Sequence, residues 1–189
     1  ARAVGDPRAS PLATLVHAFL LGRTVSVHPH IDVSAFVDLG LARGTDGFLE
    51  PLVEVRPYGQ SIDGVDQDWW VVSDFAALAG RPLGADHVLG VGGASLTLAH
   101  LTPRTAVKRA LDIGTGCGVQ ALHLTQHATE VIATDTNTRA LWAAQVSAAL
   151  SGVAFETRHG SMLEPVAGER FDLIVSNPPF VISPRAHYE

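Results

Sequence analysis

A short apolar strand that ends in a glycine-rich turn constrains the fold of this chain most. Residues 110–113 are apolar apart from one acid, and glycines follow at 114, 116 and 118 before an apolar helical pattern from Val119 to His127. Glycine lets backbone approach a ligand closely. Because the first N–H groups of a helix lack partners within it, such a turn suits a carboxylate or another strongly polar ligand group. The pattern predicts the start of an α/β unit with a ligand-binding turn.

The spacing of these glycines differs from that of a dinucleotide-binding turn. In G-x-G-x-x-G the third glycine would fall where the chain has Val119, whereas Asp-x-Gly-x-Gly-x-Gly is complete from Asp112 to Gly118. An oxidoreductase on a related fold is therefore disfavoured. A second strand, Glu130–Thr134, ends at Asp135, which lies 23 positions after Asp112. An acid at this place can accept hydrogen bonds from two ribose hydroxyls.

A third signal is the turn Asn177-Pro178-Pro179-Phe180, which follows the apolar strand 171–176. Two prolines end a strand and leave carbonyl oxygens without a ladder partner. A planar amine could donate one hydrogen to the Asn177 oxygen and the other to a proline carbonyl, while Phe180 stacks on the flat group that carries it. Taken alone, the turn is also explained as a rigid loop.

With these motifs in this order, residues 102–183 resemble a class I S-adenosylmethionine-dependent methyltransferase. The resemblance implies a Rossmann-like α/β sheet and S-adenosylmethionine as cofactor. Its loop would hold the methionine part, Asp135 the ribose, and a residue after the third strand, 153–158, the adenine. The implied cofactor-binding residues are Asp112, Gly114, Thr115, Gly116, Gly118, Asp135, Thr136, Ser161, Met162, Thr102 and Arg104.

Two of these assignments concern the ends of the cofactor. Many relatives carry Asp or Asn where Ser161 stands, so the adenine contact could come from the Ser161 hydroxyl, the Met162 N–H or a water. Thr102 and Arg104 lie in the segment before the first strand of the sheet. In relatives that segment covers the cofactor, so we expect these two residues at its methionine end.

The turn Asn177-Pro178-Pro179-Phe180 is similar to the catalytic motif of the amino-methylating branch of this family. That branch includes release-factor glutamine and ribosomal RNA guanine and adenine methyltransferases. The resemblance implies Asn177, Pro178, Pro179 and Phe180 as the acceptor site. We expect an exocyclic amine of an RNA or DNA base, because an added N-terminal module and a stacking Phe suit an extruded base. A protein glutamine amide is the alternative, and a non-catalytic cofactor-binding scaffold is an alternative of another class.

Composition limits the classes of partner that the chain can have. The chain has 189 residues and no apolar run long enough to span a bilayer, which favours a cytoplasmic enzyme without a membrane partner. Its net charge of −6 provides no global basic field for nucleic acid and leaves the glutamine reading open. The only cysteine, Cys117, is interpreted as a small space-filling residue of the loop.

The histidines do not suggest a metal site. His123 and His127 have helical i, i+4 spacing, but no Glu follows the first of them. We therefore expect no metal and place both histidines at surface or half-buried helix positions.

The first part of the chain has a different periodicity of apolar residues. Apolar residues at helical spacing predict helices over 11–21 and 31–41, the second capped by Asp32 or Ser34. Strands over 52–56 and 69–73 follow, joined by the polar stretch 59–68. We predict a winged-helix-like α+β module over 1–95 that positions the substrate, and a methyltransferase domain over 96–189. The glycine-rich stretch 90–95 is predicted as a turn with Ser95 as N-cap.

The sheet is expected to be incomplete. The family's sheet has seven strands, but only residues 181–189 follow the fourth strand candidate, which would leave an exposed apolar edge. We expect the chain to be a fragment and additional polypeptide to complete the sheet.

Overall fold

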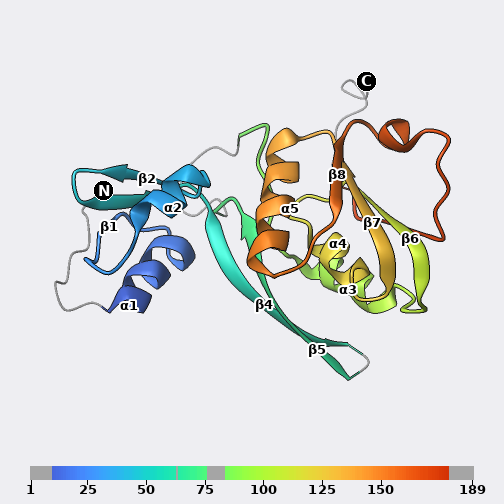
Figure 1. The fold of residues 1–189 in the computed structure, drawn as a ribbon, viewed down its shortest axis with the longest axis horizontal. Coiled ribbons are helices and arrows are strands. Elements are labelled where there is room, and N and C mark those ends of the chain that lie inside the picture. The colour runs from blue at the N-terminus through green and yellow to red at the C-terminus, as the bar shows by residue number, and fades with distance from the viewer. Residues whose placement is uncertain (1–9, 63, 76–83, 179–189) are drawn as a thin grey trace.

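The computed structural model describes residues 10–62, 64–75 and 84–178 of the chain (Figure 1). The N-terminal part contains α1 (Pro11–Leu15), the π-helix η1 (Val16–Leu20), β1 (Val25–Ser26), α2 (Val33–Asp38), β2 (Ala42–Thr45), β3 (Phe48–Pro51), β4 (Glu54–Ile62) and β5 (Val65–Ser73). The C-terminal part contains α3 (Gly93–Leu101), β6 (Val107–Ile113), α4 (Val119–Leu124), β7 (Ala128–Asp135), α5 (Thr138–Leu150), β8 (Glu156–His159), the 3-10 helix η2 (Glu164–Val166) and β9 (Leu173–Ser176).

The C-terminal part is built on a four-stranded parallel sheet with the order β8-β7-β6-β9. Its central strands are buried on both faces, as parallel strands with helical crossovers must be. Ala110 and Ala133 lie in the cluster that includes residues of α4, whereas Leu111 and Ile132 pack with Val166 of η2 on another side. The predicted α/β class with a Rossmann-like sheet is confirmed.

The register brings the carboxyl ends of the strands to one edge of the sheet. Ile113 pairs with Thr134 of β7 and with Ser176 of β9, and Asp135 pairs with His159 of β8. The residues that follow these strands therefore share that edge, where open α/β sheets bind their ligands.

Strands β4 and β5 form an antiparallel hairpin of nine residues each, paired from Glu54 with Ser73 to Ile62 with Val65. The prediction that 59–68 is a connecting loop was wrong, because this stretch continues both strands. Most of its exposed residues are polar or glycine, which is typical of a loop, but Gln67 is buried.

In the rest of the N-terminal part, only the two predicted helical regions match the structure. The Asp32 carboxylate accepts a hydrogen bond from Ser34 N and caps α2, so Asp32 rather than Ser34 is the N-cap. The small antiparallel sheet β1-β3-β2 was not predicted. Its β2–β3 turn places Asp46 and Gly47 at positive φ, as tight hairpin turns do. The likeness to a winged helix stays a prediction.

The hairpin packs against α5 of the parallel-sheet part (Figure 1). The Ser147 hydroxyl accepts a hydrogen bond from Val72 N at 2.9 Å, and the Ser151 hydroxyl accepts one from Trp70 N at 2.9 Å. Val72 belongs to the same buried cluster as Ala143 of α5. The division at residue 95 stays a prediction, but the two sides of that boundary share a core.

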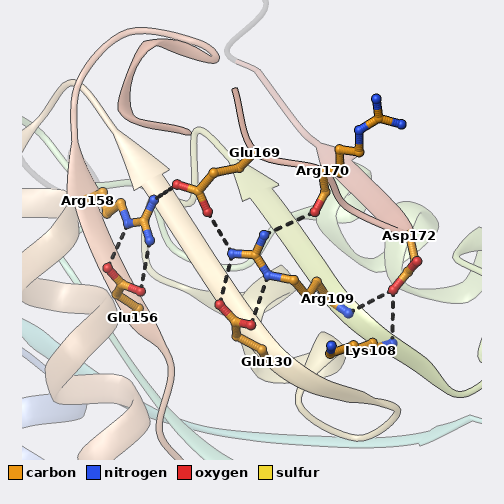
Figure 2. A network of polar contacts seen from close by, with 8 residues as sticks. All are labelled: Lys108, Arg109, Glu130, Glu156, Arg158, Glu169, Arg170 and Asp172. Atoms are coloured by element: carbon orange, nitrogen blue, oxygen red, sulfur yellow. Dashed lines mark hydrogen bonds and ion pairs between the residues drawn. The ribbon is translucent and has the colours of Figure 1, made fainter. Parts of the chain in front are cut away.

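An ion-pair network ties the segment between β8 and β9 to the sheet (Figure 2). Arg109 of β6 binds both oxygens of Glu130 at 2.9 Å and one oxygen of Glu169 at 2.6 Å. Glu169 also pairs with Arg158 of β8, which in turn binds Glu156. Single exposed pairs add little stability, whereas a network in fixed geometry holds its members in place.

The same segment is tied to β6 just before β9 begins. Figure 2 shows the Asp172 carboxylate accepting hydrogen bonds from the backbone N–H groups of Lys108 and Arg109, at 3.0 and 2.9 Å. These bonds fix the start of β9 and hence the position of the turn that follows it. Within the described residues β9 pairs with β6 alone, and Ile174 is 51% exposed.

Candidate functional site

The glycine-rich loop is tied to the end of β7. Gly114 N and Thr115 N both donate to the Thr134 carbonyl, at 2.8 and 3.0 Å. Gly114, Gly116 and Gly118 have φ of 71°, 56° and 85°, a region that favours glycine. The loop geometry therefore depends on the predicted glycines.

These glycines have two different surroundings. A Cβ added at Gly114 or Gly116 would meet no atom within 4 Å, so the space beside them is open. A Cβ at Gly118 would lie 2.9 Å from the Ala144 Cβ of α5. Gly114 and Gly116 thus leave room for a ligand, whereas Gly118 allows the loop to pack on α5.

The Asp112 side chain stabilises the glycine-rich loop through hydrogen bonds. Its Oδ2 accepts hydrogen bonds from the Thr115 hydroxyl at 2.6 Å and from Ala121 N at 3.2 Å, and the residue is fully buried. Oδ1 is buried and has no hydrogen-bond partner among the described residues. Burial, and to a smaller extent the nearby Asp135 charge, raise the pKa of Asp112 to about 7 despite the lowering effect of the two hydrogen bonds. The buried Asp112 therefore supports the conformation of the loop.

Asp135 joins the loop to the turn after β7. Its Oδ2 accepts a hydrogen bond from Gly116 N at 3.0 Å, and its Oδ1 accepts one from Asn137 N at 2.9 Å. Each carboxylate oxygen has capacity for a further bond, so Asp135 can still accept from hydroxyl groups. Thr136 is exposed beside it, and its carbonyl accepts a hydrogen bond from His159 Nε2 at 3.0 Å.

The residues after β8 lie next to Asp135. Gly160 N donates to the Asp135 carbonyl at 3.0 Å, which brings Ser161 and Met162 to the same edge of the sheet. Both are exposed, and Met162 has φ of 49°, an uncommon conformation for a residue with a side chain. Strain of this kind is concentrated at ligand sites.

The turn after β9 lies beside the start of the glycine-rich loop. The Ser176 hydroxyl donates to the Ile113 carbonyl at 2.9 Å. Asn177 is partly buried, and its Nδ2 donates to the Ser95 hydroxyl of α3 at 3.1 Å. Pro178 is exposed. Pro179 and Phe180 lie outside the described residues.

Thr102 and Arg104 are not brought to this edge, in contrast to the sequence-based expectation. Thr102 donates its hydroxyl to Leu98 O at the end of α3, and Arg104 binds His123 Nδ1 at 3.1 Å. His123 lies near the end of α4, which runs away from the glycine-rich loop. The segment before β6 that reaches the edge is the start of α3.

Sequence reasoning missed two residues at this edge, Ser95 and Gln120. Ser95 is not an N-cap, since Gly92 caps α3, and it lies within the first turn of that helix. Gln120 follows the glycine-rich loop in α4 and donates its Nε2 to the Ser95 carbonyl at 2.8 Å. A polar residue two positions after the last glycine of the loop was the available signal for Gln120.

His123 is buried, so its predicted surface or half-buried position was wrong. The Arg104 guanidinium can only donate, so His123 Nδ1 accepts and Nε2–H donates to the Tyr58 hydroxyl at 2.8 Å. Burial, together with the smaller effect of the Arg104 charge, lowers the pKa of His123 to about 4. His123 is a neutral structural residue that joins the hairpin to α4.

Other predicted features can be placed as well. Cys117 is buried, and burial raises the pKa of its thiol to about 11, so it is not a reactive thiolate. The described ranges contain no group of three His, Cys, Asp or Glu residues arranged to hold a metal ion. In the same ranges, no helix combines the length and the apolar character that crossing a bilayer requires.

Curated proteins similar to this chain include methyltransferases of two kinds. Release factor glutamine methyltransferase of Xylella fastidiosa is 32% identical over 149 residues, which are 76% of this chain and 53% of that protein. Its Enterococcus faecalis counterpart is 43% identical over 82 residues, 42% of this chain and 28% of that protein. Ribosomal RNA small subunit methyltransferase C of Salmonella arizonae is 33% identical over 135 residues, 69% of this chain and 36% of that protein. The chain thus spans from about a quarter to half of their length.

A solved structure shares the fold. The T. thermophilus 16S rRNA methyltransferase, determined in complex with AdoMet and guanosine, aligns with a TM-score of 0.50 and 22% identity, over 94% of this chain and 54% of that one. The sequence model of the methyltransferase small domain matches residues 91–189, which include the glycine-rich loop, Asp135 and the turn at Asn177. This match extends over more than half of the chain, and the protein therefore belongs to the methyltransferase small domain family.

Proposed function

We propose that the protein is an S-adenosylmethionine-dependent N-methyltransferase that acts on a planar amine, namely an exocyclic amine of an RNA or DNA base. The observation that carries the proposal is the hydrogen bond from the Ser176 hydroxyl to the Ile113 carbonyl. It joins the last residue of β9 to the last residue of β6. The turn at Asn177 therefore begins directly beside the loop that starts at Gly114.

The residues at the sheet edge fit the cofactor. The space beside Gly114 and Gly116 is open, as the methionine part requires. Asp135 has acceptor capacity left for two ribose hydroxyls. Ser161 and Met162 are exposed at the end of β8, where a flat heterocycle would follow the ribose. When bound, S-adenosylmethionine supplies an electrophilic methyl group on a positively charged sulfur.

Asn177 provides the acceptor end of the site. Its Nδ2 is occupied by Ser95, so Oδ1 is the atom that is left to accept a hydrogen from a substrate amine. The Pro178 carbonyl is the proposed second acceptor, with Pro179 stiffening the turn and Phe180 stacking on the flat group. Hydrogen bonds to both amine hydrogens would orient the nitrogen lone pair, and such placement can be worth about 7–11 kcal/mol of the barrier.

The class of substrate rests on two opposing features. A turn that ends in Phe180 and an N-terminal part that extends the molecule suit a base drawn out of a nucleic acid. The net charge of −6 suits a protein substrate, and release factor glutamine methyltransferases are among the similar proteins. A glutamine amide has the same planar –NH2 group, so it is the second candidate.

A non-catalytic scaffold is the third possibility, and it has weaker support. It would need the open space beside the loop, but it would not need Asn177 held in one orientation next to that space. The proposed location is the cytoplasm. Pairing of further polypeptide with the edge strand β9 stays a prediction, and no comparison supports it.

Labelled methyl transfer tests the proposal. The protein is incubated with methyl-tritiated S-adenosylmethionine and an extract of source cells that lack its gene, and the product is digested with nuclease or protease. We expect label that nuclease releases, and none with Asn177→Ala. Label that only protease releases would identify the glutamine alternative. Absence of any label, with S-adenosylmethionine bound, would favour the scaffold.

A further inference from the structure

The Asn177 amide is hydrogen-bonded to a side chain from a distant part of the chain. Asn177 Nδ2 lies 3.1 Å from the hydroxyl oxygen of Ser95, which is 82 positions earlier. Ser95 is 9% exposed, so little water competes with its hydroxyl. An asparagine amide has a donor end and an acceptor end of nearly the same shape, and a rotation of χ2 exchanges them. Only one of the two orientations presents an oxygen to a substrate amine.

Ser95 is itself held by the helix that follows the glycine-rich loop. Gln120 Nε2 donates to the Ser95 carbonyl at 2.8 Å, and Gln120 is 4% exposed. Gln120 is the second residue of α4, whose N-cap is Gly118 of the loop. The connection from loop to acceptor turn therefore runs through the Gln120 side chain, the Ser95 backbone and hydroxyl, and the Asn177 amide.

The backbone carbonyl and the side-chain hydroxyl of Ser95 have different hydrogen-bond partners. The bond from Gln120 reaches the backbone carbonyl, so the position of α3 does not depend on the Ser95 side chain. The hydroxyl is the part of Ser95 that is hydrogen-bonded to Asn177 in the described structure. Removal of the hydroxyl should therefore free the Asn177 amide and leave the helix in place.

We propose that Ser95 is a positioning residue, whose hydroxyl holds Asn177 Nδ2 and thereby turns Asn177 Oδ1 toward the acceptor amine. The proposal rests on the amine-methylating function proposed above. It adds a residue that precedes the cofactor loop in the sequence and that acts on the acceptor end through Asn177. Ser95 is then needed for the rate of transfer and is not needed for cofactor affinity.

Three variants test this role in the whole protein. Ser95→Ala removes the hydroxyl, and Ser95→Thr retains it. Thr97→Ala is the matched control, because Thr97 lies in the same helix and its hydroxyl donates only to the Gly93 carbonyl at 3.0 Å. Transfer of tritiated methyl is measured into the extract fraction that the wild type labels, and affinity for S-adenosylmethionine is measured by calorimetry.

We expect kcat of Ser95→Ala to fall about 10-fold, as the loss of one hydrogen bond at a positioned group implies, with cofactor Kd within 2-fold of wild type. Ser95→Thr should recover most of the rate, and Thr97→Ala should match the wild type. A Ser95→Ala protein with wild-type kcat would overturn the proposal. A loss of cofactor affinity that accounts for the whole effect would also overturn it.

A second readout does not need a substrate. The side-chain NH2 signals of Asn177 can be assigned in nitrogen-15 NMR spectra by their disappearance in Asn177→Ala. We expect these signals to shift and to exchange faster with water in Ser95→Ala and to stay unchanged in Thr97→Ala. Unchanged Asn177 signals in Ser95→Ala would refute the contact even if methyl transfer were never detected, whereas missing transfer with the expected shifts would count against the proposed function alone.

Discussion

The Asp135 carboxylate and the Gly116 backbone N–H are joined by a hydrogen bond of 3.0 Å. The acid at the end of β7 therefore holds the glycine-rich loop, and it is also the proposed acceptor for the ribose hydroxyls. A change at Asp135 should weaken both halves of the cofactor site together.

Asp135→Ala is expected to lower affinity for S-adenosylmethionine at least 10-fold, because bonds to a charged acceptor are the stronger class. Calorimetric titration measures the effect. Thr138→Ala is the control, since Thr138 is exposed at the start of α5 and should leave affinity unchanged. Equal affinity of Asp135→Ala and the wild type would contradict the ribose assignment.

Gly116 and Gly118 should respond differently to the same substitution. Gly118→Ala places a Cβ 2.9 Å from the Ala144 Cβ, so it should lower the melting temperature markedly through overpacking. Gly116→Ala meets no neighbour and should cost only about 1–2 kcal/mol for its positive φ, while its methyl group enters the space left for the cofactor. Thermal unfolding and cofactor titration of both variants would show the contrast, and a larger stability loss at Gly116 would refute it.

Asp112 should make stability depend on pH in a defined direction. Its pKa is raised from 3.8 to about 7 in the folded state, so folding is favoured while the group is protonated, and that contribution is lost as pH rises from about 4 to 7. The shift corresponds to about 4 kcal/mol. Asp112→Asn lacks this titration. We expect the free energy of unfolding of the variant, relative to wild type, to rise between pH 5 and 8 in urea titrations. A difference that stays constant with pH would show that Asp112 is ionised throughout.

The hairpin and the parallel sheet should unfold together. Ser147→Ala leaves the buried Val72 N–H without its acceptor, which should cost about 1–3 kcal/mol. Ser151→Ala is the matched control, because water can replace its more exposed hydroxyl, and it should cost less than about 1 kcal/mol. Urea unfolding followed by tryptophan fluorescence and by circular dichroism should give one coincident transition. Two separate transitions would mean that residue 95 divides independent folding units.

The meeting of the glycine-rich loop and Asp135 at one edge of the sheet could be predicted from the sequence, because its signals are local. The role of this edge in binding the cofactor stays a prediction. The glycines from Gly114 to Gly118 have the positive φ that only their residue type adopts easily, and Asp135 ends a strand of clear apolar pattern. Parallel pairing then brings these ends together without further information from the sequence. The same holds for Asn177, which directly follows β9.

The parts that the sequence did not predict depend on contacts between distant residues. His123 is buried because Tyr58 and Arg104, from the hairpin and from the α3–β6 connection, meet it. The same contact places Arg104 beside His123, near the end of α4 that is remote from the glycine-rich loop. Likewise Ser95 resembles an N-cap in the sequence, and only the packing of α3 against α4, together with its contact to the turn after β9, shows its hydrogen bond with Asn177.

Calorimetric titration with S-adenosylmethionine of the wild type and of Asn177→Ala tests the division of the site into a cofactor edge and an acceptor turn most directly. Saturable binding to the wild type, with Kd of Asn177→Ala within about 2-fold, is the predicted result, since Asn177 is assigned to the acceptor and Ser95 rather than the loop holds its side chain. Loss of cofactor binding in Asn177→Ala, or no binding by the wild type, would contradict the account.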